Sequence, residues 1–202
     1  MPNRSECLEW ESAADPAGRT RIVDAALAIA DEEGLDAVSV RRVGQRVGRR
    51  PMSLYSHVPS KDGLVALMFD RISAGLLLPE PLPDDGRERF RLIANRAFET
   101  YLAHPWMLHA FGRRPPPGPN QMRRADQSAR AAEALGVDPA DAHRALSIVH
   151  EWTMGHALHV ITLREDTVLA RAVGAGVPGT FEEGLDAVLD GVLARYGRAR
   201  DA

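Results

Sequence analysis

The residues best suited to chemistry form a basic cluster between positions 41 and 61. Six cationic side chains fall in this stretch, which contains no Asp or Glu, although the whole chain carries a formal net charge of −3. They are Arg41, Arg42, Arg46, Arg49, Arg50 and Lys61. Such local positive charge is typical of binding to a polyanion, because arginine and lysine neutralise phosphates. The alternative, a solvated arginine face, is less favoured because no acid is interleaved.

A short helix is predicted at the start of this cluster. Val40, Val43 and Val47 repeat with the helical period, and together they form one apolar face. Ser39 can act as the N-cap, and Gly48 suits a left-handed turn at the C-terminal end. The helix is therefore expected to be only about two to three turns long.

A second short helix is expected almost immediately afterwards. Pro51 fits a first helical turn, and Leu54 can point back at the valine face. Gly44 costs about 1 kcal/mol relative to alanine in mid-helix, which suggests that the second helix crosses there too closely for a side chain. Glycines at 44 and 48 are what a helix-turn-helix requires.

The segment from Leu54 to Leu64 extends this pattern. It reads Leu-Tyr-Ser-His-Val-Pro-Ser-Lys-Asp-Gly-Leu and resembles the Leu-Tyr-x-His-Phe-x-x-Lys-x-x-Leu signature of tetracycline-repressor-like (TetR family) transcription regulators. The resemblance extends from about Arg19 to Leu76. Arg49 departs from it, because the family usually has a small apolar residue under the turn at this position. Either its side chain reaches out to a phosphate or the local packing differs.

The expected DNA contacts fall into two groups. Base edges are expected to be read from the front of the second helix, where arginine can bind guanine and methionine can touch a thymine methyl. These candidates are Arg50, Pro51, Met52, Ser53 and Ser56. The resemblance implies that Tyr55, His57 and Lys61 hold phosphates, and we expect Thr20, Ser39, Arg41 and Arg49 to join them. Because one short helix contacts only a few base pairs, double-stranded operator DNA is expected to bind a homodimer.

The chain is predicted to be all-α and to contain two domains. Three prolines between positions 79 and 83 cannot continue a helix, so they mark a boundary. We expect a flexible tail over 1–18, a helix-turn-helix domain with a linking helix over 19–78, and a larger helical domain over 79–202. Thr20 is the expected N-cap of the first helix, and Ser60 that of the linking helix.

The second domain is expected to dimerise through its last two helices. Asp138-Pro139 has the form of an N-cap followed by a first-turn proline, and opens the longest expected helix, which reaches about Arg164. This helix and the last one resemble those that form a four-helix dimer bundle in the tetracycline repressor subgroup. The implied interface residues are Val149, Thr153, Val160, Phe181, Leu185, Val188 and Val192. Ordinary intrachain core is the alternative.

The resemblance also implies a small-molecule effector, apolar or aromatic, that binds the second domain and releases the DNA. The candidate lining residues are Phe98, Tyr101, Trp106, Met107, Phe111, Met122, Trp152, Met154 and His156. Aromatic and methionine side chains suit flat apolar ligands, although core packing is an equally good interpretation of any one of them. The histidines lack the spacing of a zinc-protease motif, so neither a metal nor another cofactor is expected.

The composition agrees with a cytoplasmic protein. Cys7 is the only cysteine, so no intramolecular disulfide can form, and no apolar run is long enough to predict a membrane partner. The function that the resemblance implies is a ligand-responsive, homodimeric transcriptional repressor rather than an enzyme. The alternatives are a helical-bundle enzyme that retains a helix-turn-helix, or an architectural DNA binder with little dependence on sequence.

Overall fold

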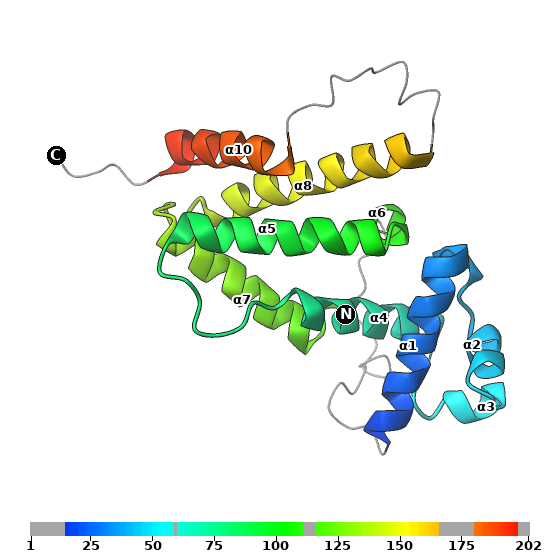
Figure 1. Ribbon diagram of the computed structural model, residues 1–202. Helices are drawn as coiled ribbons and strands as arrows, with labels where there is room; N and C mark the ends of the chain where they lie inside the picture. The colour runs from blue at the N-terminus through cyan, green and yellow to red at the C-terminus, as the bar shows by residue number, and fades with distance from the viewer. Residues whose placement is uncertain (1–14, 59, 111–115, 166–179, 198–202) are drawn as a thin grey trace. The chain divides into compact units, whose positions relative to one another are not determined.

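The computed structural model describes residues 15–58, 60–110, 116–165 and 180–197. Helices account for all the regular elements in those ranges, which confirms the prediction of an all-α chain (Figure 1). The chain divides into two compact units. The first runs to Gly75 and also includes residues 109–122, whereas the second contains residues 76–108 and those from Arg123 onward.

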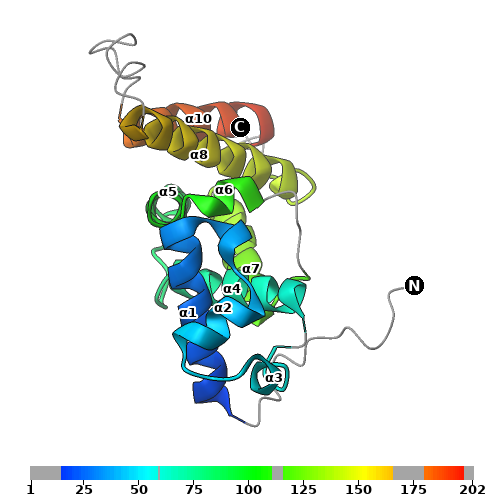
Figure 2. The same ribbon diagram turned by 90° about the vertical axis from the view of Figure 1, so that its right-hand side faces the viewer.

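The first unit contains a helix-turn-helix and the longer helices that support it. Its elements are α1 (Pro16–Glu33), the 3-10 turn η2 (Leu35–Ala37), α2 (Val40–Arg46), α3 (Pro51–Leu54) and α4 (Lys61–Leu76). α2 contacts both α1 and α3, as the two views show (Figures 1 and 2). Ile22, Val43, Leu54 and Leu64 are each no more than 1% exposed. The valine face of α2 and Leu54 of α3 therefore belong to the core of this unit.

The predicted caps and turn of the helix-turn-helix are confirmed. The Ser39 hydroxyl accepts the backbone N–H three residues further on, at 3.3 Å, and α2 begins there. Gly48 has a φ of +67°, the left-handed conformation that glycine adopts most readily. Pro51 occupies the first turn of α3. The Ser60 hydroxyl accepts the Gly63 N–H at 3.0 Å at the start of α4.

α1 begins earlier than the sequence predicted. Asp15 is its N-cap and accepts the Gly18 N–H at 2.8 Å, and Pro16 follows as the first helical residue. Thr20 therefore lies inside α1, where its hydroxyl donates to the Pro16 carbonyl at 3.0 Å. The prediction of Thr20 as N-cap was wrong because Asp-Pro provides a strong start signal further upstream.

The second unit is built from helices on either side of a shared apolar core. Its elements are α5 (Gly86–Ala103), α6 (Trp106–Ala110), α7 (Pro119–Ala134), α8 (Ala142–Glu165) and α10 (Phe181–Tyr196). α5, α8 and α10 run side by side (Figure 1). Phe90, Ala131, Ala145 and Leu185 meet in this core. α6 and α7 each contribute one end to the first unit.

α8 is the longest of the described helices, as predicted, but it starts later than Asp138. The Asp138 carboxylate accepts the Ala140 N–H at 2.9 Å, and its carbonyl accepts the Asp141 N–H at 2.9 Å. Its own N–H donates to the Tyr196 carbonyl at 3.0 Å, at the end of α10. Asp138-Pro139 thus forms a turn that joins the end of α10, and the helix begins at Ala142.

The N-terminus of α7 is fixed by a buried carboxylate on α4. Asp70 accepts the Asn120 N–H and its side-chain amide, each at 2.8 Å, and the Gln121 N–H at 3.2 Å. These bonds satisfy amide groups that have no partner within the helix, and the carboxylate is favourable at the positive end of the helix dipole. The contact explains why residues 109–122 cluster with the first unit.

Candidate nucleic-acid interface and effector cavity

The residues proposed to read bases lie on an exposed surface around α3. Leu54 is 1% exposed and anchors the helix, whereas Met52 is 80% exposed, although it is the larger apolar side chain. Arg50, Pro51, Ser53 and Ser56 are exposed as well. An apolar side chain held out in water beside an arginine and two hydroxyls has no role in the packing of this unit. It is available for contact with the edges of bases.

The hydroxyls on this surface are oriented by the backbone of α3. Ser53 donates to the Arg50 carbonyl at 2.8 Å, and Ser56 donates to the Ser53 carbonyl at 2.9 Å. Each oxygen keeps its lone pairs free to accept from a base or from water. Tyr55 and Lys61, proposed as phosphate contacts, are exposed, and His57 is half-buried.

The six basic residues of the cluster are not equally available. Arg46 binds Glu32 through both terminal nitrogens, at 2.6 and 2.5 Å, and Arg42 forms an ion pair with Glu33. The hydrogen bond from Arg46 lowers the pKa of Glu32. The stretch from 41 to 61 contains no acid of its own, but α1 supplies Glu32 and Glu33 from the end of its last turn. Within the described residues, Arg41, Arg50 and Lys61 form no ion pair with a carboxylate.

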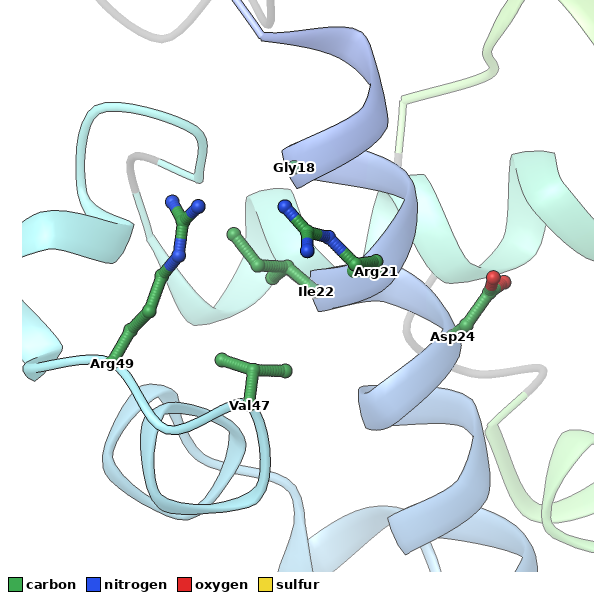
Figure 3. A pocket seen from close by; sticks show the side chains of 6 residues that line it. All are labelled: Gly18, Arg21, Ile22, Asp24, Val47 and Arg49. Carbon is green, nitrogen blue, oxygen red and sulfur yellow. The ribbon is translucent and has the colours of Figure 1, made fainter.

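The side chain of Arg49, for which the sequence left two interpretations open, lies at the surface of the first unit. It is 38% exposed and extends away from the turn, near His57 (3.5 Å between nitrogens) and at 3.9 Å from the Asp15 carboxylate. It lines a hollow of about 310 Å³ together with Arg21 and Val47. Figure 3 shows Arg21 of α1 and Arg49 reaching toward this hollow, whereas Asp24 points away. The side chain therefore leaves the turn for the surface, and its contact with a phosphate stays a prediction.

The second unit contains a cavity of about 530 Å³ among α5, α7, α8 and the turn before α8. Its apolar wall is formed by side chains such as Phe90 and Ile93 of α5 and Leu146 and Val149 of α8. Its polar groups are Arg124 and Ser128 of α7 and His143, Ser147, His150 and Thr153 of α8. A mostly apolar cavity of this size with a few polar groups is typical of a small-molecule site.

The residues that the sequence proposed for the effector lie outside the lining of this cavity. Phe98 stacks on Phe181 with ring centroids 4.3 Å apart, and Trp152 lies 5.0 Å from Phe181 and 5.3 Å from His156. These rings form an aromatic cluster between α5, α8 and α10. Tyr101, Trp106 and Met107 are buried, Met154 is half-buried, Met122 is exposed, and Phe111 lies outside the described residues. The alternative interpretation, core packing, fits Phe98 and Trp152 better.

The polar residues of the cavity were not predicted from the sequence, although their spacing places them on shared helix faces. His143, Ser147 and His150 repeat at the helical period beside the apolar stripe of α8, and Arg124 and Ser128 are one turn apart on α7. Burial, together with the nearby charge of Arg124, lowers the pKa of His150 to about 4. His150 is therefore neutral at physiological pH. Burial likewise raises the pKa of Tyr101, whose ring lies 6.2 Å from that of His150, to about 12.

Five of the proposed dimer residues belong to the core of a single chain. Val149, Thr153, Phe181, Leu185 and Val192 are each no more than 6% exposed. Val160 and Val188 are half-buried. A side chain already covered by its own chain cannot contact a partner, so the apolar stripes of α8 and α10 indicate intrachain packing at these five positions. The surface left on α8 includes Ile148 and Leu158, which are 39% and 44% exposed.

Two other features of the described residues concern metals and membranes. No three His, Cys, Asp or Glu side chains in the described ranges come together in a group that could hold a metal ion. Burial lowers the pKa of His156, and the nearby His159 lowers it in the same direction. None of the described helices is long and apolar enough to span a membrane.

An exposed helix-turn-helix in one unit and a cavity in a second, helical unit define the class of helix-turn-helix regulators. Residues 22–68 match the family described as "Bacterial regulatory proteins, tetR family", and residues 78–174 match "Tetracyclin repressor-like, C-terminal domain". The chain therefore belongs to the TetR family of transcriptional regulators.

Individual relatives agree with this assignment. The transcriptional repressor DrrR1 of Streptomyces coeruleorubidus is 34% identical over 138 residues, which are 68% of this chain and 51% of DrrR1. The chain thus spans about half the length of that relative. The class A tetracycline repressor of transposon 1721 from Escherichia coli is 28% identical, over 86% of this chain and 89% of its own.

The fold is also found in a solved complex. The structure of ActR from Streptomyces coelicolor in complex with actinorhodin has a TM-score of 0.74 and 27% sequence identity. The match covers 90% of this chain and 97% of that one. The similarity therefore includes both units of the chain.

Proposed function

We propose that this protein is a ligand-responsive transcriptional repressor, which binds operator DNA as a homodimer and is released when a small molecule occupies the cavity of the second unit. The observation that carries the proposal is the exposed surface of α3, where Arg50 and Met52 are held in water by a buried Leu54. Its family consists of transcriptional regulators rather than enzymes. The cytoplasm is its proposed location, because operator DNA lies there in bacteria.

The DNA contacts are proposed to divide by chemistry. Arg50, Met52, Ser53 and Ser56 face the bases, with Pro51 setting the start of the helix. Arg41, Tyr55, His57 and Lys61, together with Ser39 and Thr20, face phosphates. Arg49 joins the phosphate group, since Arg21 reaches toward the same hollow and the Asp15 carboxylate, 3.9 Å from Arg49, is a more distant partner than those of Arg42 and Arg46 (Figure 3). Arg42 and Arg46 are excluded from direct contact because they are paired with α1.

The dimer is proposed to form through the exposed faces of α8 and α10. On α8 this face carries Ile148, Gly155 and Leu158 at helical spacing, and on α10 it carries the small residues Ala187 and Gly191. Small side chains allow helices to approach closely, and the apolar pair on α8 gives the contact a hydrophobic centre. Dimerisation is required because two recognition helices are needed to read paired half-sites.

The effector is proposed to act through α7. This helix carries Arg124 in the wall of the cavity, and its first amides are bound by Asp70 of α4. A ligand that shifts α7 therefore also shifts the helix that follows the helix-turn-helix. Asp70→Asn should keep both DNA binding and effector binding but weaken the coupling between them, because a neutral amide holds the helix N-terminus less firmly.

The proposal is tested by fluorescence anisotropy of labelled duplexes from the DNA flanking the gene, titrated with the full chain at several KCl concentrations. Tight binding that weakens steeply with salt, and that exceeds binding to a scrambled duplex at every salt, supports it. Equal affinity for both duplexes would favour an architectural binder. No binding even at low salt would leave the helical-bundle enzyme as the better candidate.

A further inference from the structure

The wall of the cavity in the second unit has an unbalanced charge. Its lining contains one arginine, Arg124, and two histidines, His143 and His150, but no Asp or Glu. The remaining polar groups are the hydroxyls of Ser128, Ser147 and Thr153, and the Thr153 hydroxyl already donates to the Val149 carbonyl at 2.8 Å. The cavity therefore offers positive charge and hydrogen-bond donors on an otherwise apolar surface.

Arg124 differs from several other arginines of this unit, which are held by a carboxylate or a backbone carbonyl. Arg91 binds both oxygens of Asp186 at 2.6 and 2.8 Å, and Arg130 binds Glu80 at 2.9 Å. Arg96 donates to the Leu77 carbonyl at 2.5 Å. Arg124 is half-buried, yet within the described residues it has no ion pair or hydrogen bond with a carboxylate. Its charge acts instead on two neutral neighbours in or beside the cavity, His150 and Tyr101.

Filling this cavity changes the environment of Arg124. A neutral apolar ligand would remove water from the guanidinium without replacing the hydrogen bonds of that water, which is costly for a charged group. A ligand with an anionic oxygen would replace that water with short, charge-assisted hydrogen bonds, and a carboxylate can accept two of them from the guanidinium fork. The permanent charge of arginine makes this preference independent of pH in the physiological range.

We propose that the effector is a flat apolar molecule that carries an acidic group, a carboxylate or an ionised phenol, and that Arg124 binds its anionic oxygen. Ser128 lies one turn beyond Arg124 on α7, and Ser147 and His150 approach from α8, so they donate to the remaining oxygens. The rings rest against Phe90, Ile93 and Leu146. This inference rests on the proposed function only in treating the cavity as the effector site.

The test uses two probes of nearly the same shape, the anion 2-naphthoate and the neutral 2-naphthamide. Isothermal titration of the full chain at pH 7.5 gives their dissociation constants for the native protein, Arg124→Gln and Arg124→Lys. Arg123→Gln is the matched control, because Arg123 precedes Arg124 on α7 but is exposed and lies outside the cavity lining. We expect 2-naphthoate to bind the native protein at least about tenfold more tightly than 2-naphthamide, since charged hydrogen bonds stabilise by about 1.5 to 3 kcal/mol.

The preference for the acid should disappear in Arg124→Gln, survive in part in Arg124→Lys and remain complete in Arg123→Gln. Equal affinities of the two probes for the native protein would overturn the proposal. So would a preference that persists in Arg124→Gln, or failure of both probes to bind. Operator binding, measured by anisotropy in the same samples, separates the acidic effector from the proposed repressor function. A protein that binds DNA normally but does not distinguish the two probes refutes only the acidic effector.

Discussion

Gly44 and Arg49 are in contact through their backbones at the centre of the helix-turn-helix. The Arg49 N–H donates to the Gly44 carbonyl at 2.9 Å, and the Arg49 carbonyl lies 2.9 Å from the position that a Cβ on residue 44 would occupy. A side chain at Gly44 would therefore lack room, as expected, but the nearest atom belongs to the turn before α3, whereas the crossing helix contributes Pro51 at 3.6 Å. The turn between α2 and α3 depends on this close approach.

Gly44→Ala should destabilise the first unit by about 2 kcal/mol, because the added methyl meets a backbone oxygen that cannot rotate away. Operator affinity should fall with it. Gly75→Ala is the control, since a Cβ at this helical position meets no atom within 4 Å. It should leave stability unchanged or raise it by up to about 1 kcal/mol. Chemical denaturation measures the free energy of unfolding of both variants. Equal values would show that the Arg49 carbonyl does not lie close to residue 44.

Arg50→Ala should relax the preference for one operator position by about 1 to 3 kcal/mol, because arginine at the front of α3 can grip a guanine through two hydrogen bonds. Binding is measured against duplexes that carry each base at that position. Lys61→Ala, the comparison, should weaken binding to all of these duplexes alike. If Arg50→Ala lowers affinity for operator and random DNA equally, Arg50 contacts phosphate instead.

Arg41→Ala and Arg46→Ala should differ in their salt dependence although both remove a cation from α2. Arg41 has no carboxylate partner among the described residues, so its loss should reduce the slope of log Kobs against log salt by about one. Arg46 is neutralised by Glu32, with 2.5 Å between the charged groups, and its loss should leave the slope nearly unchanged. Identical slopes for the two variants would mean that the ion pair between Arg46 and Glu32 breaks when the protein binds DNA.

Leu158→Glu and Leu185→Glu should separate the dimer surface from the core. Leu158 is exposed on α8, so a charge there should yield folded monomers that bind operator DNA weakly. Leu185 has no exposed surface, and an unpaired carboxylate there should cost more than about 4 kcal/mol and prevent folding. Sedimentation and circular dichroism distinguish the outcomes. Dimeric Leu158→Glu would place the interface elsewhere.

Stability should fall in mild acid because of His150. Burial lowers its pKa from the ordinary 6.5 to about 4, so between these values the unfolded chain binds a proton that the native chain does not. This contribution is fully present above pH 6.5 and is lost as the pH falls toward 4. Between pH 7.5 and 5 the native protein should lose about 2 kcal/mol more than His150→Gln. Parallel losses in urea denaturation would contradict the assigned burial of His150.

The helix-turn-helix could be predicted from the sequence because its determinants are local. Ser39, Gly48 and Pro51 act on backbone groups within a few residues of themselves, so their spacing alone fixes the caps and the turn. The pairing of Arg46 with Glu32 could not be predicted in the same way. It depends on how α1 lies against α2, which joins residues 14 positions apart.

The effector cavity was less predictable, for a related reason. Large aromatic residues such as Phe98 and Trp152 suit a ligand pocket and a packed core equally well, and only the meeting of helices decides between them. Arg124 and His150 come together from α7 and α8, which no periodicity within one helix could reveal. Leu185 is buried within its own chain, and the apolar stripe that suggested it for the dimer surface indicates burial without indicating the partner.

Selection of bound duplexes from a randomised library tests the central claim most directly. A dimer that presents two copies of α3 should enrich a two-fold symmetric sequence whose half-sites lie about one helical turn apart, or a multiple of it. The same selection with Arg50→Ala should lose one defined position in each half-site. Recovery of a random pool, or of single unpaired half-sites, would contradict the claim that this protein recognises operator DNA as a symmetric dimer.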